Sequence, residues 1–258
     1  MALLKRLGGA GPDALLLHGY GSDSLSWVVN QTALEPAATL HAVDLPGHGA
    51  ATLDVGDGSV AALAAQVAQA LDAGGLKRLN VVGHSLGGAV AMRLAQDRPD
   101  LVGSLALIAP AGLGQGVDAG FLDAYPEMAD AAAATALMQR LVVQPRLIGR
   151  VLVARVLAQL AEEGRRDALR RIAAALQADA AAHEATAEAI GRIAPTVLPR
   201  LVVWGAQDAI NPHDPERLAR FGAQTLIAPE AGHLPHIESA KSVNDALLAF
   251  LQARAATA

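Results

Sequence analysis

Short apolar runs recur along the chain, and each one ends at a glycine, a proline or a polar residue. The runs cover residues 14–17, 40–43, 79–82, 105–109, 201–204 and 225–228. Apolar side chains occupy both alternating sets of positions, which is typical of strands buried on both faces of a parallel sheet. The opening segment, residues 3–7, is predicted to be a short antiparallel strand at the edge of that sheet.

Helical stretches separate these runs. Residues 59–73 begin with a serine suited to the N-cap and are followed by two glycines, which suit a helix end. Further helices are predicted over residues 86–96, over 212–221 with Pro212 in the first turn, and over 239–253. Alternating strands and helices require crossover connections. We therefore predict an α/β fold with a mostly parallel central sheet and helices on both faces.

Residues 111–195 interrupt this alternation. They contain alanine-rich helical stretches and no clear strand pattern, although predicted sheet strands precede and follow them. The chain must therefore leave the sheet and return to it. We predict one α/β core, made of residues 1–110 and 196–258, with a helical cap of residues 111–195 inserted between two strands.

Composition narrows the function classes. Of the 258 residues, 52% are hydrophobic and 17% are charged, so a large core is available. The absence of cysteine excludes disulfides, thiolate metal sites and a cysteine nucleophile. A net charge of −5 argues against a nucleic-acid partner. No apolar run is long enough to cross a bilayer, and no export signal is visible, so we expect a cytoplasmic protein that binds no membrane.

The segment GHSLGG at residues 83–88 follows a predicted strand and opens a predicted helix. A nucleophile elbow needs this context, because a sharp turn between strand and helix exposes the serine hydroxyl. Small residues on either side let the neighbouring backbone approach closely. The pattern therefore indicates Ser85 as a nucleophile.

A serine hydroxyl needs a base, and eight histidines are available. His233 lies in a glycine-led loop between the last predicted strand and the final helix, and we predict it to be the base. His236 is its closest rival. His84 precedes the nucleophile directly and is expected to point away from it.

The imidazole in turn needs a carboxylate that fixes its tautomer. Asp208 follows the predicted strand 201–204, and the chain order Ser85, Asp208, His233 is the order that α/β-hydrolases use. Asp44 is the alternative, because it also ends a strand. Its place before a Pro-Gly turn favours a role in holding that turn.

The remaining parts of the predicted site are a pair of oxyanion donors and a pocket. The backbone N–H groups of Tyr20, in the HGYG turn at residues 18–21, and of Leu86 are the expected donors. The pocket candidates are His18, Phe121, Met138 and Leu141. The three cap residues among them also fit the core of an ordinary amphipathic helix. This chemistry requires no metal and no organic cofactor.

Together these motifs resemble the α/β-hydrolase superfamily over essentially the whole chain. DLPGHG at residues 44–49, Trp204-Gly205 and Gly232-His233 extend the resemblance beyond the elbow. Shorter motifs are similar to the hydrolase-like domain of the acetyltransferase component of acetoin dehydrogenase complexes: WVVNQ at 27–31, VGDGS at 55–59 and IAPAGLG at 108–114. This similarity implies a dehydrogenase complex as a possible partner. Independently of it, a homo-oligomer is also possible.

Proteins of that group usually carry a lipoyl domain ahead of the hydrolase-like domain, whereas this chain starts almost at its first predicted strand. We therefore expect a stand-alone hydrolase or a chain without its lipoyl part. The leading interpretation is a serine hydrolase that cleaves a small carboxylic ester or thioester through an acyl-serine. Two alternatives stay open: hydrolysis of a carbon–carbon bond in a diketone, and a hydrolase-like module without catalytic activity.

Overall fold

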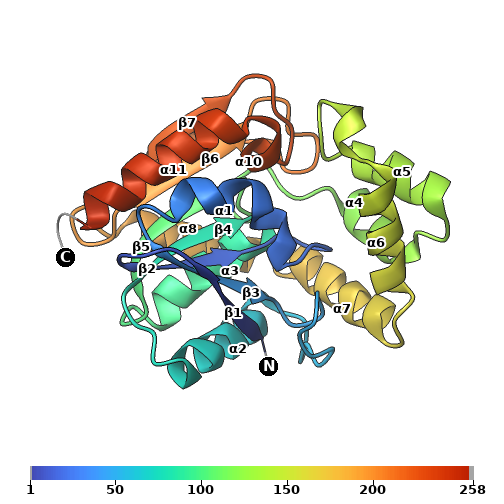
Figure 1. The fold of residues 1–258 in the computed structure, drawn as a ribbon, viewed down its shortest axis with the longest axis horizontal. Coiled ribbons are helices and arrows are strands. Elements are labelled where there is room, and N and C mark those ends of the chain that lie inside the picture. The colour runs from blue at the N-terminus through green and yellow to red at the C-terminus, as the bar shows by residue number, and fades with distance from the viewer. Residues whose placement is uncertain (1, 256–258) are drawn as a thin grey trace.

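A seven-stranded sheet runs through the centre of the molecule (Figure 1). The computed structural model describes residues 2–255. The strand order is β1-β3-β2-β4-β5-β6-β7, and β1 alone pairs antiparallel to its neighbour within this described sheet. The strands are β1 (Leu3–Gly8), β2 (Asp13–Leu17), β3 (Thr39–Asp44), β4 (Leu79–His84), β5 (Val102–Ile108), β6 (Arg200–Gly205) and β7 (Gln224–Ala228).

Eleven α-helices are found in the described part of the chain, together with 3-10 turns at Ser24–Trp27, Tyr125–Glu127 and Pro145–Leu147. None of these helices is both long enough and apolar enough to span a membrane. The helices are α1 (Val28–Leu34), α2 (Val60–Ala73), α3 (Leu86–Asp97), α4 (Ala119–Ala124), α5 (Ala131–Gln139), α6 (Arg150–Leu160), α7 (Arg165–Ala178), α8 (Ala180–Gly191), α9 (Pro215–Phe221), α10 (Pro235–Glu238) and α11 (Ala240–Ala255).

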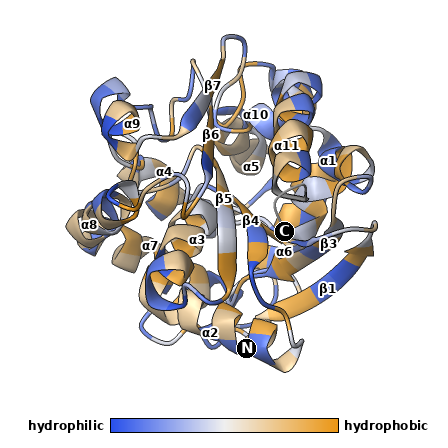
Figure 2. Cartoon of the chain, turned by 90° about the vertical axis from the view of Figure 1, so that its left-hand side faces the viewer, coloured by the Kyte–Doolittle hydropathy of each residue, from blue (hydrophilic) through white to orange (hydrophobic). Residues whose placement is uncertain are grey.

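Helices cover both faces of the sheet, and alternate residues of each inner strand supply the two cores. Leu15 and Leu17 of β2 join the cluster beneath α2 and α3, whereas Ala14 and Leu16 join the cluster beneath α1 and α11. Figure 2 shows the resulting layers, with α2 and α3 on one side of the strands and α1 and α11 on the other. Burial on both faces explains why the strands are apolar at successive positions.

The segment between β5 and β6 carries helices α4 to α8. Residues of α4 to α7 form a separate apolar cluster, which includes Phe121, Met138 and Val156. In Figure 1, α4 to α7 lie to one side of the sheet, whereas α8 lies with the core. Helix α8 packs against α3 and α9, and its Ile190 belongs to the main core. The predicted cap of residues 111–195 therefore contains one helix that contributes to the sheet layers.

The predicted fold class is confirmed, including the antiparallel edge strand and the Ser59 N-cap, whose hydroxyl accepts the Ala62 N–H. One helix start was wrong. Helix α9 begins at Pro215 and not at Pro212, because the Asp214 carboxylate accepts the N–H groups of residues 216 and 217 and caps the helix there. Helices α1 and α10 were not predicted, because each is too short to show a clear apolar period.

The strand order also determines where a site can form. The chain proceeds from β2 outward to β3 and then crosses back to β4 on the other side of β2. In such sheets the loops after the strands diverge at this reversal and leave a crevice at the carboxyl ends. The loops that follow β2 and β4, which contain residues 18–23 and Ser85, both open into this crevice.

Candidate active site

Ser85 occupies a sharp turn between β4 and α3. Its φ of 51° and ψ of −113° lie in a region that residues with a side chain rarely adopt. The backbone is held there by hydrogen bonds, because the Ser85 N–H donates to the Ile108 carbonyl and the Ser85 carbonyl accepts from Gly88 and Ala111. This is the geometry of a nucleophile elbow.

Two glycines make the turn possible by allowing close backbone contacts. A Cβ at Gly83 would lie 2.5 Å from the Gly87 carbonyl oxygen, and a Cβ at Gly87 would lie 2.3 Å from the Leu17 carbonyl oxygen. Both distances are below any van der Waals contact. The small residues of the motif therefore let α3 begin directly against β2 and β4.

The structure brings the three predicted triad side chains together. His233 Nε2 lies 3.0 Å from Ser85 Oγ, and His233 Nδ1 lies 2.8 Å from Asp208 Oδ2. Since the carboxylate accepts the Nδ1 proton, Nε2 is free to accept the serine proton. All three residues are buried, with 3–6% of their surface exposed. The backbone N–H of His233 donates to the Leu141 carbonyl, which fixes the loop that carries His233.

Asp208 accepts hydrogen bonds at both carboxylate oxygens. Oδ1 accepts the N–H groups of Ile210 and Asn211, each at 2.9 Å. Oδ2 accepts the indole N–H of Trp204 at 3.0 Å in addition to the His233 proton. Sequence reasoning did not identify Trp204 or Asn211 as supports of the acid, because only the folded turn brings their donors to the carboxylate.

Asp44 and His236, the alternatives for the acid and the base, lie in other surroundings. Asp44 accepts hydrogen bonds from Lys5, Ser24 and Ala50, so it holds the turn after β3 to the N-terminal strand. His236 lies against Trp27 and His84, and neither of its ring nitrogens has a hydrogen-bond partner within residues 2–255. Burial lowers the pKa of His236 to about 3.

His84 corrects one expectation. Rather than pointing away from the site, its side chain lines the cavity in front of Ser85, and its Nε2 lies 2.9 Å from the His233 carbonyl oxygen. The β4 strand carries it to the sheet edge together with Ser85. Burial, followed by the neighbouring His236 and His233, holds the pKa of His84 well below its usual value.

The predicted oxyanion donors lie at this same edge. Leu86 is the first residue of α3, so its N–H has no acceptor within the helix. The turn with Tyr20 packs directly against the elbow, since a Cβ at Gly19 would stand 3.3 Å from Ser85 Cβ. The Tyr20 hydroxyl donates to the Leu169 carbonyl, which connects this turn to α7.

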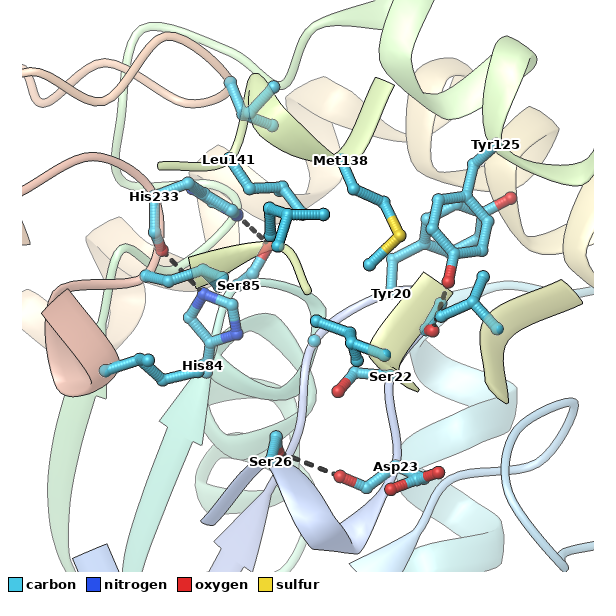
Figure 3. Close-up of a pocket in the computed structure, with 18 of the residues that line it drawn as sticks. Tyr20, Ser22, Asp23, Ser26, His84, Ser85, Tyr125, Met138, Leu141 and His233 are labelled. Carbon is cyan, nitrogen blue, oxygen red and sulfur yellow. Dashed lines mark hydrogen bonds between the residues drawn. The ribbon is translucent and has the colours of Figure 1, made fainter. Parts of the chain in front are cut away.

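A cavity of about 210 Å³ opens in front of Ser85 (Figure 3). Phe121, Met138 and Leu141 line it, as predicted from the sequence, together with Tyr125 and Ile210. His18 is not part of its lining. Both ring nitrogens of His18 are engaged by the backbone, because Nδ1 donates to the Gly19 carbonyl and Nε2 accepts the Leu45 N–H.

Polar groups gather along one side of this cavity. Figure 3 shows Ser22, Asp23, Ser26 and His84 below Ser85, whereas Met138 and Leu141 lie above it. The Asp23 carboxylate pairs with Arg155 of α6, which also lines the cavity. Among residues 2–255 there is no group of three or more metal-ligating side chains that could hold a metal ion.

Comparison with known proteins supports this architecture. The model of the alpha/beta hydrolase family matches residues 14–246. The chain is 36% identical, over 95% of its length, to the dihydrolipoyllysine-residue acetyltransferase component of the acetoin cleaving system of Pseudomonas putida, and 32% identical to the protein of the same name from Cupriavidus necator, over 93%. It spans 65% and 63% of the length of these two relatives.

Among solved structures, the meta-cleavage product hydrolase of Pseudomonas fluorescens IP01 superposes with a TM-score of 0.83, at 18% identity. The match covers 98% of this chain and 94% of the hydrolase. At this identity the superposition establishes a common fold. The family match and the shared fold together show that the chain belongs to the alpha/beta hydrolase family.

Proposed function

We propose that this protein is a serine hydrolase that cleaves a small carboxylic ester or thioester through an acyl-serine intermediate. The observation that carries the proposal is the unbroken chain of hydrogen bonds from Ser85 Oγ through the His233 ring to Asp208. A scaffold has no physical need for this buried arrangement on a strained turn.

In the first step His233 Nε2 takes the Ser85 proton while Oγ bonds to the acyl carbon. The carbonyl oxygen becomes an oxyanion, which the N–H groups of Tyr20 and Leu86 stabilise. The C–O or C–S bond then breaks, and the leaving group takes the proton from His233. The product of this step is an ester between the acyl group and Ser85.

Hydrolysis of this ester repeats the same chemistry with water. His233 takes a proton from the water molecule as its oxygen attacks the acyl carbon, and then returns a proton to Ser85 Oγ. Asp208 orients the ring in both steps and stabilises the imidazolium. The apolar residues Phe121, Met138 and Leu141 offer a wall for an acyl chain.

A second candidate is acyl transfer from the same acyl-serine to a thiol. The names of the two relatives favour it, because both are called dihydrolipoyllysine-residue acetyltransferase components. A dihydrolipoyl thiol would then replace water, and a dehydrogenase complex would be the partner. Adding dihydrolipoamide to the assay tests this candidate: transfer yields S-acyl dihydrolipoamide, which mass spectrometry detects, whereas pure hydrolysis yields only the acid.

The primary test is the hydrolysis of p-nitrophenyl acetate, butyrate and octanoate by the wild type and by Ser85→Ala. We expect turnover by the wild type and loss of at least about 10³-fold in the variant. Ser242→Ala, at an exposed position of α11, is the matched control and keeps the wild-type rate. Equal rates for Ser85→Ala and the wild type contradict the proposal. Inactivity of the wild type on all three esters and on acetyl-dihydrolipoamide favours the non-catalytic module.

A further inference from the structure

His84 presents an unused hydrogen-bond acceptor to the cavity. Its Nε2 lies 2.9 Å from the His233 carbonyl oxygen, and a carbonyl oxygen can only accept. The proton of the neutral ring therefore lies on Nε2, which leaves a lone pair on Nδ1. This nitrogen has no protein partner among the described residues.

The surroundings keep His84 neutral. The ring is buried, with its centroid 4.9 Å from that of His233 and 4.7 Å from that of His236. A positive charge at His84 would lie beside the imidazolium that forms on His233 during the reaction. The Nδ1 lone pair is therefore an acceptor throughout the catalytic cycle.

Nδ1 lies close to the reacting atoms. A Cβ added at Gly19 would stand 2.7 Å from His84 Nδ1 and 3.3 Å from Ser85 Cβ, so one small region of space borders both side chains. His84 and Ser85 both line the cavity. Figure 3 shows His84 on the side of the cavity that also carries Ser22 and Ser26, across from Met138 and Leu141.

We propose that His84 Nδ1 accepts a hydrogen bond from a hydroxyl group of the substrate, carried by a carbon one to three bonds from the scissile carbonyl carbon. The inference rests on the proposed ester or thioester hydrolysis and specifies its substrate class as hydroxylated. A carboxylate at this position is disfavoured, because its oxygens would face a lone pair. The hydroxyl can belong to the acyl group, as in a 2-hydroxy acid ester, or to the alcohol, as in a diol monoester.

Two matched pairs of esters distinguish these sources. For the acyl source, ethyl 2-hydroxypropanoate, as separate enantiomers, is compared with ethyl 2-methylpropanoate. For the alcohol source, 2-hydroxyethyl butanoate is compared with propyl butanoate. In each pair a hydroxyl replaces a methyl group of similar size. The readout is the ratio of kcat/KM values within a pair.

The variant His84→Gln removes the acceptor at Nδ1 and keeps the donor at the other end of the side chain. A glutamine amide nitrogen stands where Nε2 stood and still donates to the His233 carbonyl, while no lone pair remains at the position of Nδ1. For one of the two pairs, we expect the kcat/KM ratio of the hydroxylated ester to its methyl analogue to be about five- to tenfold higher in the wild type than in this variant. Intrinsic differences in ester reactivity cancel, because both proteins act on the same esters.

His183→Gln is the matched control, because His183 is also buried but lies outside the cavity lining. It keeps the wild-type ratios. A second readout needs no variant: the wild-type ratio for each pair is compared with the ratio for hydroxide-catalysed hydrolysis of the same two esters. We expect the wild-type ratio to exceed the hydroxide ratio for one pair, and this comparison decides the question if His84→Gln does not fold.

Equal ratios in the wild type and His84→Gln for both pairs overturn the inference, as do wild-type ratios that do not exceed the hydroxide ratios for either pair, while ester hydrolysis itself stands. Failure of the proposed function gives a different result, because then no ester of either pair is hydrolysed by the wild type. A ratio that changes equally in His183→Gln also overturns the inference, since the effect is then not specific to Nδ1.

Discussion

Asp208 illustrates how much a single buried side chain depends on its surroundings. Four donors converge on its two oxygens: the backbone N–H groups of Ile210 and Asn211, the Trp204 indole and the His233 ring. Hydrogen bonds from these donors stabilise the charged carboxylate, although burial disfavours it. The acid is therefore held in one orientation before any substrate arrives.

Asp208→Asn tests the role of this charge. The amide oxygen can still accept the two backbone N–H groups, so we expect the variant to fold with a Tm near that of the wild type. Because an amide neither fixes the His233 tautomer nor stabilises the imidazolium, kcat for p-nitrophenyl butyrate falls by about 10⁴-fold. Asp245→Asn, on the exposed face of α11, serves as the control. A loss in kcat below tenfold contradicts the assignment.

For single residues, the sequence predicted the side chains that follow strand ends, but not the hydrogen bonds that form between separate loops of the folded chain. Ser85 follows β4 directly and Asp208 follows β6 after a short turn, so their place at the carboxyl ends of the strands could be predicted. The ring of His18 was expected in the pocket, yet the backbone of Gly19 and Leu45 binds both of its nitrogens. Its partners come from two separate loops, and no spacing in the sequence encodes them.

Between elements, α6 is connected to the loop that follows β2. The Asp23 carboxylate accepts hydrogen bonds from Arg155 and Gln159 of α6, and it also caps the 3-10 turn through the Leu25 N–H. Asp23 is buried and lies three residues after Tyr20. The helix over the cavity and the turn with the proposed oxyanion donor are thereby held together.

Arg155→Gln weakens this connection. Because the arginine is partly exposed, we expect the free energy of unfolding to fall by only about 1 kcal/mol. The turn with Tyr20 loses a constraint, so kcat/KM for p-nitrophenyl esters falls by about tenfold. Urea unfolding and steady-state kinetics measure the two effects. Arg150→Gln, at the exposed start of the same helix, changes neither. Unchanged kcat/KM in Arg155→Gln contradicts the positioning role.

Element boundaries were predictable where a local signal exists. The apolar runs predicted the strands, and Ser59 predicted the N-cap of α2. The start of α9 was misplaced because two prolines lie close together and only Asp214 decides between them. The packing of α8 on α3 could not be predicted, since alanine-rich helices show little apolar periodicity that would identify a face.

For the molecule as a whole, several histidines are buried in uncharged form. His48 and His236 are buried, and desolvation lowers the pKa of each to about 3. Burial lowers the pKa values of His18 and His84 in the same direction. In the unfolded chain these side chains return to the ordinary value of about 6.5. Protons therefore bind preferentially to the unfolded chain between about pH 6.5 and pH 3.

This linkage predicts that stability is lost as the pH falls below 6.5, well above the range in which carboxylates titrate. For His48 and His236, the loss in the free energy of unfolding approaches about 1.4 kcal/mol per pH unit each as the pH falls below 6.5. Urea unfolding at pH 7.5, 6.5 and 5.5 measures the loss, which we expect to be steep only below pH 6.5. His236→Phe removes one of the titrating groups, so its loss between pH 6.5 and pH 5.5 is smaller by about 1 kcal/mol. A flat profile down to pH 5.5 contradicts this prediction.

Ser85 is the residue that we propose to carry the acyl group. Treatment with a p-nitrophenyl alkylphosphonate tests it directly, because Oγ displaces nitrophenolate and forms a stable phosphonate ester. We expect the intact mass of the wild type to rise by one phosphonyl group, the peptide with Ser85 to carry it, and Ser85→Ala to stay unlabelled. An adduct on another residue, equal labelling of Ser85→Ala, or no adduct on the wild type would contradict the claim.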